Sequence, residues 1–157
     1  MLKRFFAGIC LLLSVGLLLG GCSGKSCKDT FISAYNDSLQ FISGFSLTSD
    51  NDLAGTRQKG EDNYTGSYQA DYLGFTDQEI LFGGTGLERE TANQLTVTFS
   101  LQVDSGEGGL YWLNKEGPHP LQQGSGSGTL QIQLSDGDNY LVSAGKGWTG
   151  SISLTVS

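Results

Sequence analysis

The sequence predicts a mainly β protein, an antiparallel β-sandwich of about seven strands preceded by one short amphipathic helix. Apolar and polar residues alternate with a period of two in several segments after residue 64, which is the pattern of strands that bury one face. Glycine accounts for 24 of the 157 residues and proline for 2, without a collagen-like repeat, so the glycines indicate many turns. Two sheets that each have one apolar face bury those faces by packing together.

Four segments alternate clearly, and three shorter ones are further strand candidates. The clear strands are 64–72, 95–103, 130–134 and 152–156, and the shorter ones are 79–82, 109–114 and 139–144. Asp104-Ser105-Gly106 and Asp136-Gly137-Asp138 contain residues that tolerate left-handed backbone. We therefore expect hairpins that pair 94–103 with 109–114 and 128–134 with 139–144. The topology, immunoglobulin-like or jelly-roll, stays open.

Residues 29–44 predict the amphipathic helix. Its apolar stripe consists of Phe31, Ile32, Tyr35, Leu39 and Ile42. This stripe recurs at helical spacing, and Gly44 is a typical stop. The polar face carries Asp37 and no basic residue, unlike helices that lie on membrane surfaces, so we expect the stripe to pack on the folded domain. Residues 45–63 then form a polar connection to a sandwich domain over 64–157.

The amino-terminal segment has the pattern of a secretory signal peptide. Lys3 and Arg4 precede a continuous apolar stretch that runs from Phe5 to Leu19. At 1.5 Å per residue this stretch spans about 22 Å as a helix, which is less than the roughly 30 Å of a hydrocarbon core. A basic start, a short apolar core and then small residues predict a signal peptide over 1–21, with an uncleaved membrane anchor as the alternative.

The segment ends in Leu19-Gly20-Gly21-Cys22, which resembles the lipobox of bacterial lipoproteins. The resemblance implies that a diacylglyceryl group is joined to the Cys22 sulfur and that cleavage follows before Cys22. Two acyl chains anchor a protein stably without spanning the bilayer. We therefore expect a lipid-anchored protein on the extracytoplasmic side of the cell membrane, with residues 22–28 as a lipidated tether. Its six flexible residues, 23–28, reach about 13 Å.

Charge and cysteine content limit the partners. The 9 basic and 16 acidic residues give a net charge of −7, which argues against a nucleic-acid partner. Without residues 1–21 the chain loses Lys3 and Arg4, and the balance becomes −9. Cys27 is then the one unmodified cysteine, so no internal disulfide is expected. The second half of the chain, from Tyr64 through 150–154, contains Tyr72-Leu73-Gly74-Phe75 and the segment 81–85. On these motifs it is similar to small surface lipoproteins of Gram-positive gut bacteria.

Few residues have the chemistry of catalysis or metal binding. The single histidine, His119, lies between two prolines with no nucleophile in the pattern. Asp50-Asn51-Asp52 and 136–139 offer oxygen ligands but lack a complete calcium-loop motif. Glu88 and Glu90 have the pattern of solvated loop charges. We therefore expect no catalytic residue, no metal and no cofactor.

Aromatic residues are the remaining candidates for ligand binding. Tyr64, Tyr68 and Tyr72 form a stripe on one face and are expected in the core. The ligand-binding candidates are Tyr111, Trp112, Tyr140 and Trp148. The expected function is a non-enzymatic binding or structural module, held by membrane lipid and open to a glycan or an envelope protein as partner. The alternative is a carbohydrate-binding module, which requires two or more exposed, roughly coplanar rings.

Overall fold

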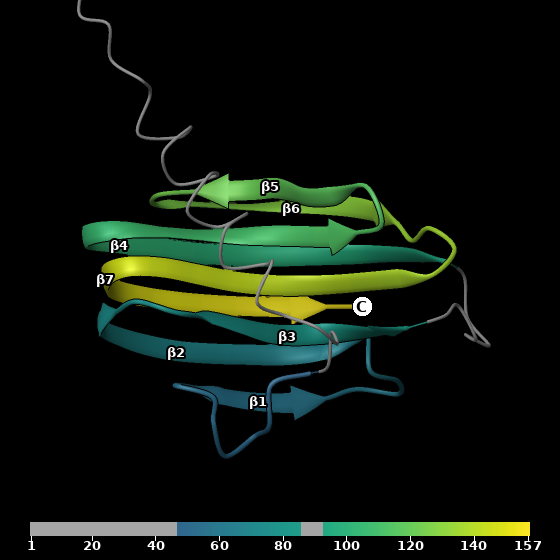
Figure 1. Cartoon of the computed structure of the whole chain (residues 1–157), viewed down its shortest axis with the longest axis horizontal. Coiled ribbons are helices and arrows are strands. Elements are labelled where there is room, and N and C mark those ends of the chain that lie inside the picture. Colours follow the sequence, from purple (N-terminus) through teal and green to yellow (C-terminus); the bar gives the residue numbers. More distant parts are fainter. Residues whose placement is uncertain (1–46, 86–92) are drawn as a thin grey trace, which may run out of the picture.

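The computed structural model describes residues 47–85 and 93–157. The described residues form seven antiparallel strands, which are β1 (Thr56–Lys59), β2 (Gly66–Phe75), β3 (Gln78–Thr85), β4 (Gln94–Asn114), β5 (Gly117–Gln123), β6 (Gly126–Gln133) and β7 (Asp138–Val156) (Figure 1). The predicted seven-stranded antiparallel fold is confirmed. The predicted helix over 29–44 and residue Cys22 lie outside the described residues.

The strands form two layers, and β4 and β7 run through both. Layer one contains β6, the first half of β4, the second half of β7, β2 and β1. Layer two contains β5, the second half of β4, the first half of β7 and β3. Figure 1 shows β4 and β7 curving from one layer into the other at the same end of the molecule, where β2 also turns into β3. The sandwich is therefore a single sheet that folds over on itself.

This topology corrects both predicted hairpins. Asp104-Ser105-Gly106 is a bend inside β4, and the halves of β4 lie in different layers instead of pairing. Strand β6 pairs with the first half of β4, from Gln94↔Gln133 to Leu101↔Gly126, and not with 139–144. An alternating pattern shows which face of a strand is buried but not which strand lies beside it. The predicted connection over 45–63 also contains β1, which pairs with β2.

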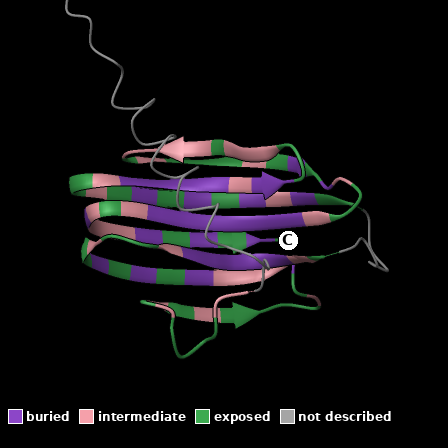
Figure 2. Cartoon of the chain, viewed as in Figure 1, coloured by how far each residue is buried: buried purple, intermediate pink, exposed green. Residues whose placement is uncertain are grey.

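The main core lies between the layers. It consists of Tyr64, Tyr68, Ala70, Tyr72, Leu81, Phe82, Leu95, Val97, Phe99, Leu101, Leu110, Ile132, Leu134, Leu141, Trp148, Ile152, Leu154 and Val156. The expected burial of the tyrosine stripe is confirmed, because Tyr64, Tyr68 and Tyr72 are all buried. In Figure 2 the strands of layer one alternate between buried and exposed residues, as strands with one solvated face do.

Glycines permit the chain to cross between the layers. Each of the four crossings, β2 to β3, the β4 bend, β5 to β6 and the β7 bend, carries one glycine with φ near +70°. These are Gly74 (φ 67°), Gly106 (φ 77°), Gly124 (φ 71°) and Gly147 (φ 63°). Other residue types rarely adopt this left-handed conformation. The bends in β4 and β7 are also in contact, since a Cβ on Gly106 would stand 2.1 Å from the carbonyl oxygen of Gly147.

Replacing Gly106 by alanine is expected to destabilise the domain more than replacing Gly74. Both substitutions force alanine into left-handed backbone, at about 1–2 kcal/mol. Only Gly106→Ala also drives a methyl group into the β7 bend, because a Cβ on Gly74 meets no atom within 4 Å. Urea unfolding of the two variants measures the difference. Equal losses of unfolding free energy would show that the β4 and β7 bends do not constrain each other.

Candidate functional site

Trp148, one of the four predicted ligand-binding rings, fills the folded end of the sandwich. It is fully buried, and its Nε1 donates to the carbonyl oxygen of Gln102 at 2.9 Å. The ring centroid of Trp148 lies 4.4 Å from that of Tyr72. Glycine at position 108 makes room for it, because a Cβ there would stand 2.4 Å from the indole. Trp148 therefore holds the bend of β7 and is not available to a ligand.

The other three rings do not share one exposed surface. Tyr111 and Tyr140 are buried on the outer face of layer two, where they belong to a second apolar cluster. Trp112 points to the opposite side, because successive residues of a strand face opposite ways, and it packs half-buried against the main core. The arrangement thus lacks the two exposed coplanar rings that sugar stacking requires.

His119 also lies apart from reactive groups in the described residues. It sits on β5 opposite Trp112 of β4, and the two ring centroids are 5.1 Å apart. Its Nε2 lies 3.1 Å from the Asn114 side-chain oxygen. Within residues 47–85 and 93–157 no group of three or more histidine, cysteine, aspartate or glutamate side chains could hold a metal ion. The His119 environment therefore offers hydrogen bonding and ring packing.

The outer face of layer one is covered mainly with uncharged polar side chains, which we name the polar face, and the exposed Asp71 adds a carboxylate beside Ser151. The polar face consists of Gln58, Ser67, Gln69, Thr98, Ser100, Gln102, Ser127, Thr129, Gln131, Ser151, Ser153 and Thr155. Pairing brings these residues into rows across the sheet. One row runs Gln58–Ser67–Thr155–Thr98–Thr129 over β1, β2, β7, β4 and β6. Adjacent side chains of a row are about 4.8 Å apart.

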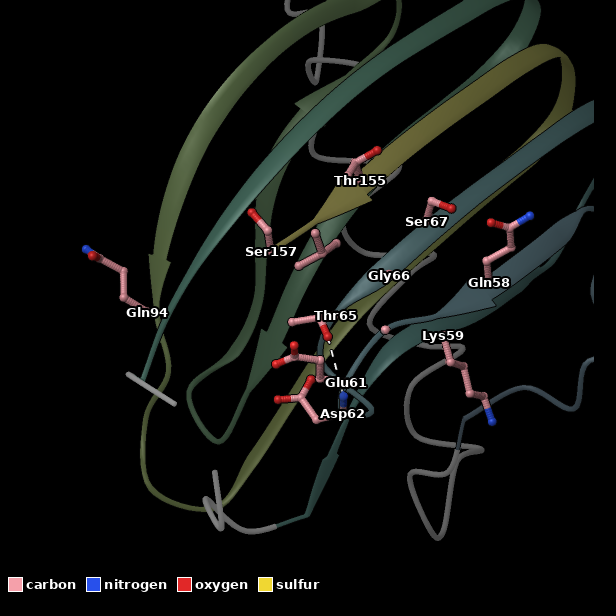
Figure 3. A pocket seen from close by; sticks show the side chains of 12 residues that line it. Gln58, Lys59, Glu61, Asp62, Thr65, Gly66, Ser67, Gln94, Thr155 and Ser157 are labelled. Carbon is pink, nitrogen blue, oxygen red and sulfur yellow. Dashed lines mark hydrogen bonds between the residues drawn. The ribbon is translucent and has the colours of Figure 1, made fainter. Parts of the chain in front are cut away.

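A groove of about 640 Å³ continues the polar face at the open end of the sandwich. Figure 3 shows Gln58, Ser67 and Thr155 on the strands that form one side of it. The β1–β2 loop adds Glu61 and Asp62. Hydroxyl, amide and carboxylate groups and the ammonium group of Lys59 therefore line the groove, and they suit a ligand that offers many hydrogen-bonding groups. Sequence alternation marks the outward residues of each strand, but only strand pairing shows that they form one surface.

A buried carboxylate connects the two layers on the inside. Glu79 of β3 is 3% exposed, and its Oε2 accepts hydrogen bonds from the Tyr68 hydroxyl at 2.6 Å and the Tyr72 hydroxyl at 2.7 Å. The backbone N–H of Ala54 donates to Oε1. Ser143 of β7 extends the network, with its Oγ 3.0 Å from the Tyr72 hydroxyl. Sequence reasoning missed this cluster, because Glu79 lies in a short strand without any motif around it.

Burial changes the acidity of the tyrosines in the described domain. Desolvation is the main cause that raises the pKa of Tyr68 and Tyr72 far above the usual value, and for Tyr68 the hydrogen bond to Glu79 adds to it. Desolvation also raises the pKa of Tyr111 to about 12. The neutral phenols are therefore the forms that the fold stabilises.

The chain was compared with known proteins. No protein-family model matches it, and no curated protein matches it. The part of the chain that the structure describes contains no helix long and apolar enough to cross a membrane.

Alkaline pH is expected to unfold the domain through its buried tyrosines. Because their pKa values are raised in the folded state, their contribution to stability is complete below about pH 10, the unfolded value. The contribution of Tyr111 is lost as the pH rises toward about 12, which is the pKa of Tyr111 in the folded state. A shift of this size is worth at most about 3 kcal/mol. Urea midpoints measured from pH 8 to 11.5 should fall above pH 10, and less steeply for Tyr111→Phe. A flat profile would contradict this expectation.

Proposed function

We propose that the protein is a lipid-anchored lipoprotein of the extracytoplasmic envelope that acts as a non-enzymatic binding or structural module. The observation that carries the proposal is the Leu19-Gly20-Gly21-Cys22 motif, which follows a basic start and an apolar stretch too short to span a bilayer. A thiolate is the nucleophile that acyl transfer to this position needs, and small neighbours give an enzyme access to the backbone.

The described domain is consistent with a module that works at the end of a tether. Its first described residue, Leu47, follows Cys22 by 25 positions, and a tethered domain meets envelope partners at a high effective concentration. Most groups of the polar face are neutral hydrogen-bonding groups, so binding there is made of many weak contacts. Each hydrogen bond that replaces one to water contributes about 0.5–1.5 kcal/mol.

A carbohydrate-binding module remains the second candidate, and the polar face now supports it in place of the rings. Neutral glycans carry hydroxyl and amide groups that alternate as donors and acceptors, and rows of Ser, Thr and Gln present the same groups.

Acylation at Cys22 is tested by labelling cells with an alkyne fatty-acid analogue. We expect the unsubstituted protein and Cys27→Ala to be labelled, and Cys22→Ala to lose labelling and keep residues 1–21, because cleavage follows lipid transfer. Cys27→Ala is the matched control, since it removes the other cysteine of residues 22–28. Equal labelling of Cys22→Ala and the unsubstituted protein would refute the anchor.

Glycan binding by the polar face is tested by adding a bulky charge at its centre. Ser153 is exposed on the middle strand of layer one, so Ser153→Arg should leave the fold intact and lower co-sedimentation with purified cell-wall polysaccharide at least several-fold. Asn51→Arg adds the same charge at an exposed loop position away from the face and serves as the control. Equal binding by both variants, or no binding by the unsubstituted protein, would remove this candidate.

A further inference from the structure

The outer face of layer two differs in character from the polar face. It carries six apolar side chains, which we name the outer cluster: Ile80 of β3, Tyr111 and Leu113 of β4, and Tyr140, Val142 and Ala144 of β7. Their strand neighbours Leu110 and Leu141 belong to the main core between the layers. The outer cluster therefore points away from the sandwich interior, as the alternation of strand side chains requires.

The outer cluster is buried even though it lies on the outside of the sandwich. None of its members is more than 6% exposed, and Tyr111, Tyr140 and Val142 are 2% exposed or less. Among the described residues, Leu47 is the partly buried apolar residue that packs against the outer cluster without belonging to it. One leucine cannot cover two tyrosine rings, which bury 150–250 Å² each. A larger apolar surface is needed to account for this burial.

Hydrogen bonds fix where the chain reaches the cluster. The Thr48 backbone N–H donates to the carbonyl oxygen of Ile80 at 3.1 Å, and the Ile80 N–H donates to the Thr48 Oγ1 at 2.8 Å. Arg57 holds the same segment, since it donates to the Thr48 carbonyl oxygen at 2.7 Å and pairs with Asp50 at 2.6 Å. Residues 48–50 are thus bound along the edge of β3, with Leu47 at the border of the outer cluster.

We propose that the amphipathic segment 29–44 packs its apolar stripe onto the outer cluster and forms a third layer of the domain. Residue 44 can lie no more than about 11 Å from Leu47, because the two positions are three steps apart along the chain. A helix over 29–44 is about 24 Å long. The outer cluster extends over about 14 Å from Tyr140 to Ala144 along β7, at 3.4 Å per residue. The segment is therefore near enough and long enough to cover it.

Charge favours this occupant over a membrane surface. Segment 29–44 contains Asp29 and Asp37 and no lysine or arginine, whereas helices that bind anionic bilayers are rich in basic residues. Its stripe and the outer cluster are both rich in aliphatic and aromatic side chains, so each supplies the apolar surface that the other must bury. Docking there leaves the polar face, on the opposite layer, open to partners. The inference does not depend on acylation at Cys22.

Hydroxyl-radical footprinting of the full chain tests the proposal. We expect Leu39→Asp to raise the modification of Tyr111 and Tyr140 at least about five-fold, while Tyr68, between the layers, stays protected. Gln40→Asp places the same charge one position away, on the side of segment 29–44 opposite its apolar stripe. This control should change the modification of neither Tyr111 nor Tyr140. Unchanged protection of Tyr111 and Tyr140 in Leu39→Asp, with Tyr68 protected, would overturn the proposal.

Photo-crosslinking decides the matter if Leu39→Asp unfolds the domain and exposes Tyr68 as well. A benzoylphenylalanine residue at position 39 should crosslink within one chain to peptides of β3, β4 or β7 that carry the outer cluster, and the same residue at position 40 should not. Crosslinks between two chains would identify a second copy as the occupant and overturn the proposal. Crosslinks to lipid, or none to these strands, would overturn it too.

Discussion

The architecture depends on two long strands that must bend at the same place. β4 and β7 are paired from Val97↔Val156 on one side of the bend to Asn114↔Asn139 on the other, so neither can fold over without its partner. The register shifts between Val103 and Glu107 mark where the ladder adjusts, and such irregularities allow a strand to turn sharply. Because both strands continue through the bend, it joins the two layers covalently. The shared bend of β4 and β7 therefore positions the strands on both sides of the core.

Filling the bend determines the role of the aromatic residues. A folded sheet leaves space on the inside of its curve, and the rings of Tyr72, Phe75 and Trp148 fill that space. The ring centroid of Tyr72 lies 4.4 Å from that of Phe75 and 4.4 Å from that of Trp148. Glu79 lies beside Tyr72 and accepts hydrogen bonds from the hydroxyl groups of Tyr68 and Tyr72, which offsets the cost of burying its side chain. Large rings and a charge that elsewhere mark ligand sites here stabilise the fold.

The outer faces of the two layers differ in polarity and in exposure to solvent. The outer face of layer one carries serine, threonine and glutamine in rows and is exposed, whereas that of layer two is apolar and buried. An exposed apolar face of this kind would favour association of chains, so covering it removes a surface through which chains would associate. This asymmetry leaves one face of the domain open to its surroundings, while the other contributes to its stability.

The sequence by itself determined most of the strand segments, though not β1 or β5, together with the burial of the tyrosine stripe and the mainly β class. Side-chain alternation and turn chemistry are local, so they can be read from the chain. It also carries the Cys22 motif, which is read directly from the chain. Only the tertiary structure decided that 94–114 is one strand crossing both layers, that Glu79 meets Tyr68 and Tyr72, and that Ser67, Thr155 and Thr98 share a row. These features depend on which strands become neighbours. That choice is set by packing between distant segments, which no local pattern encodes.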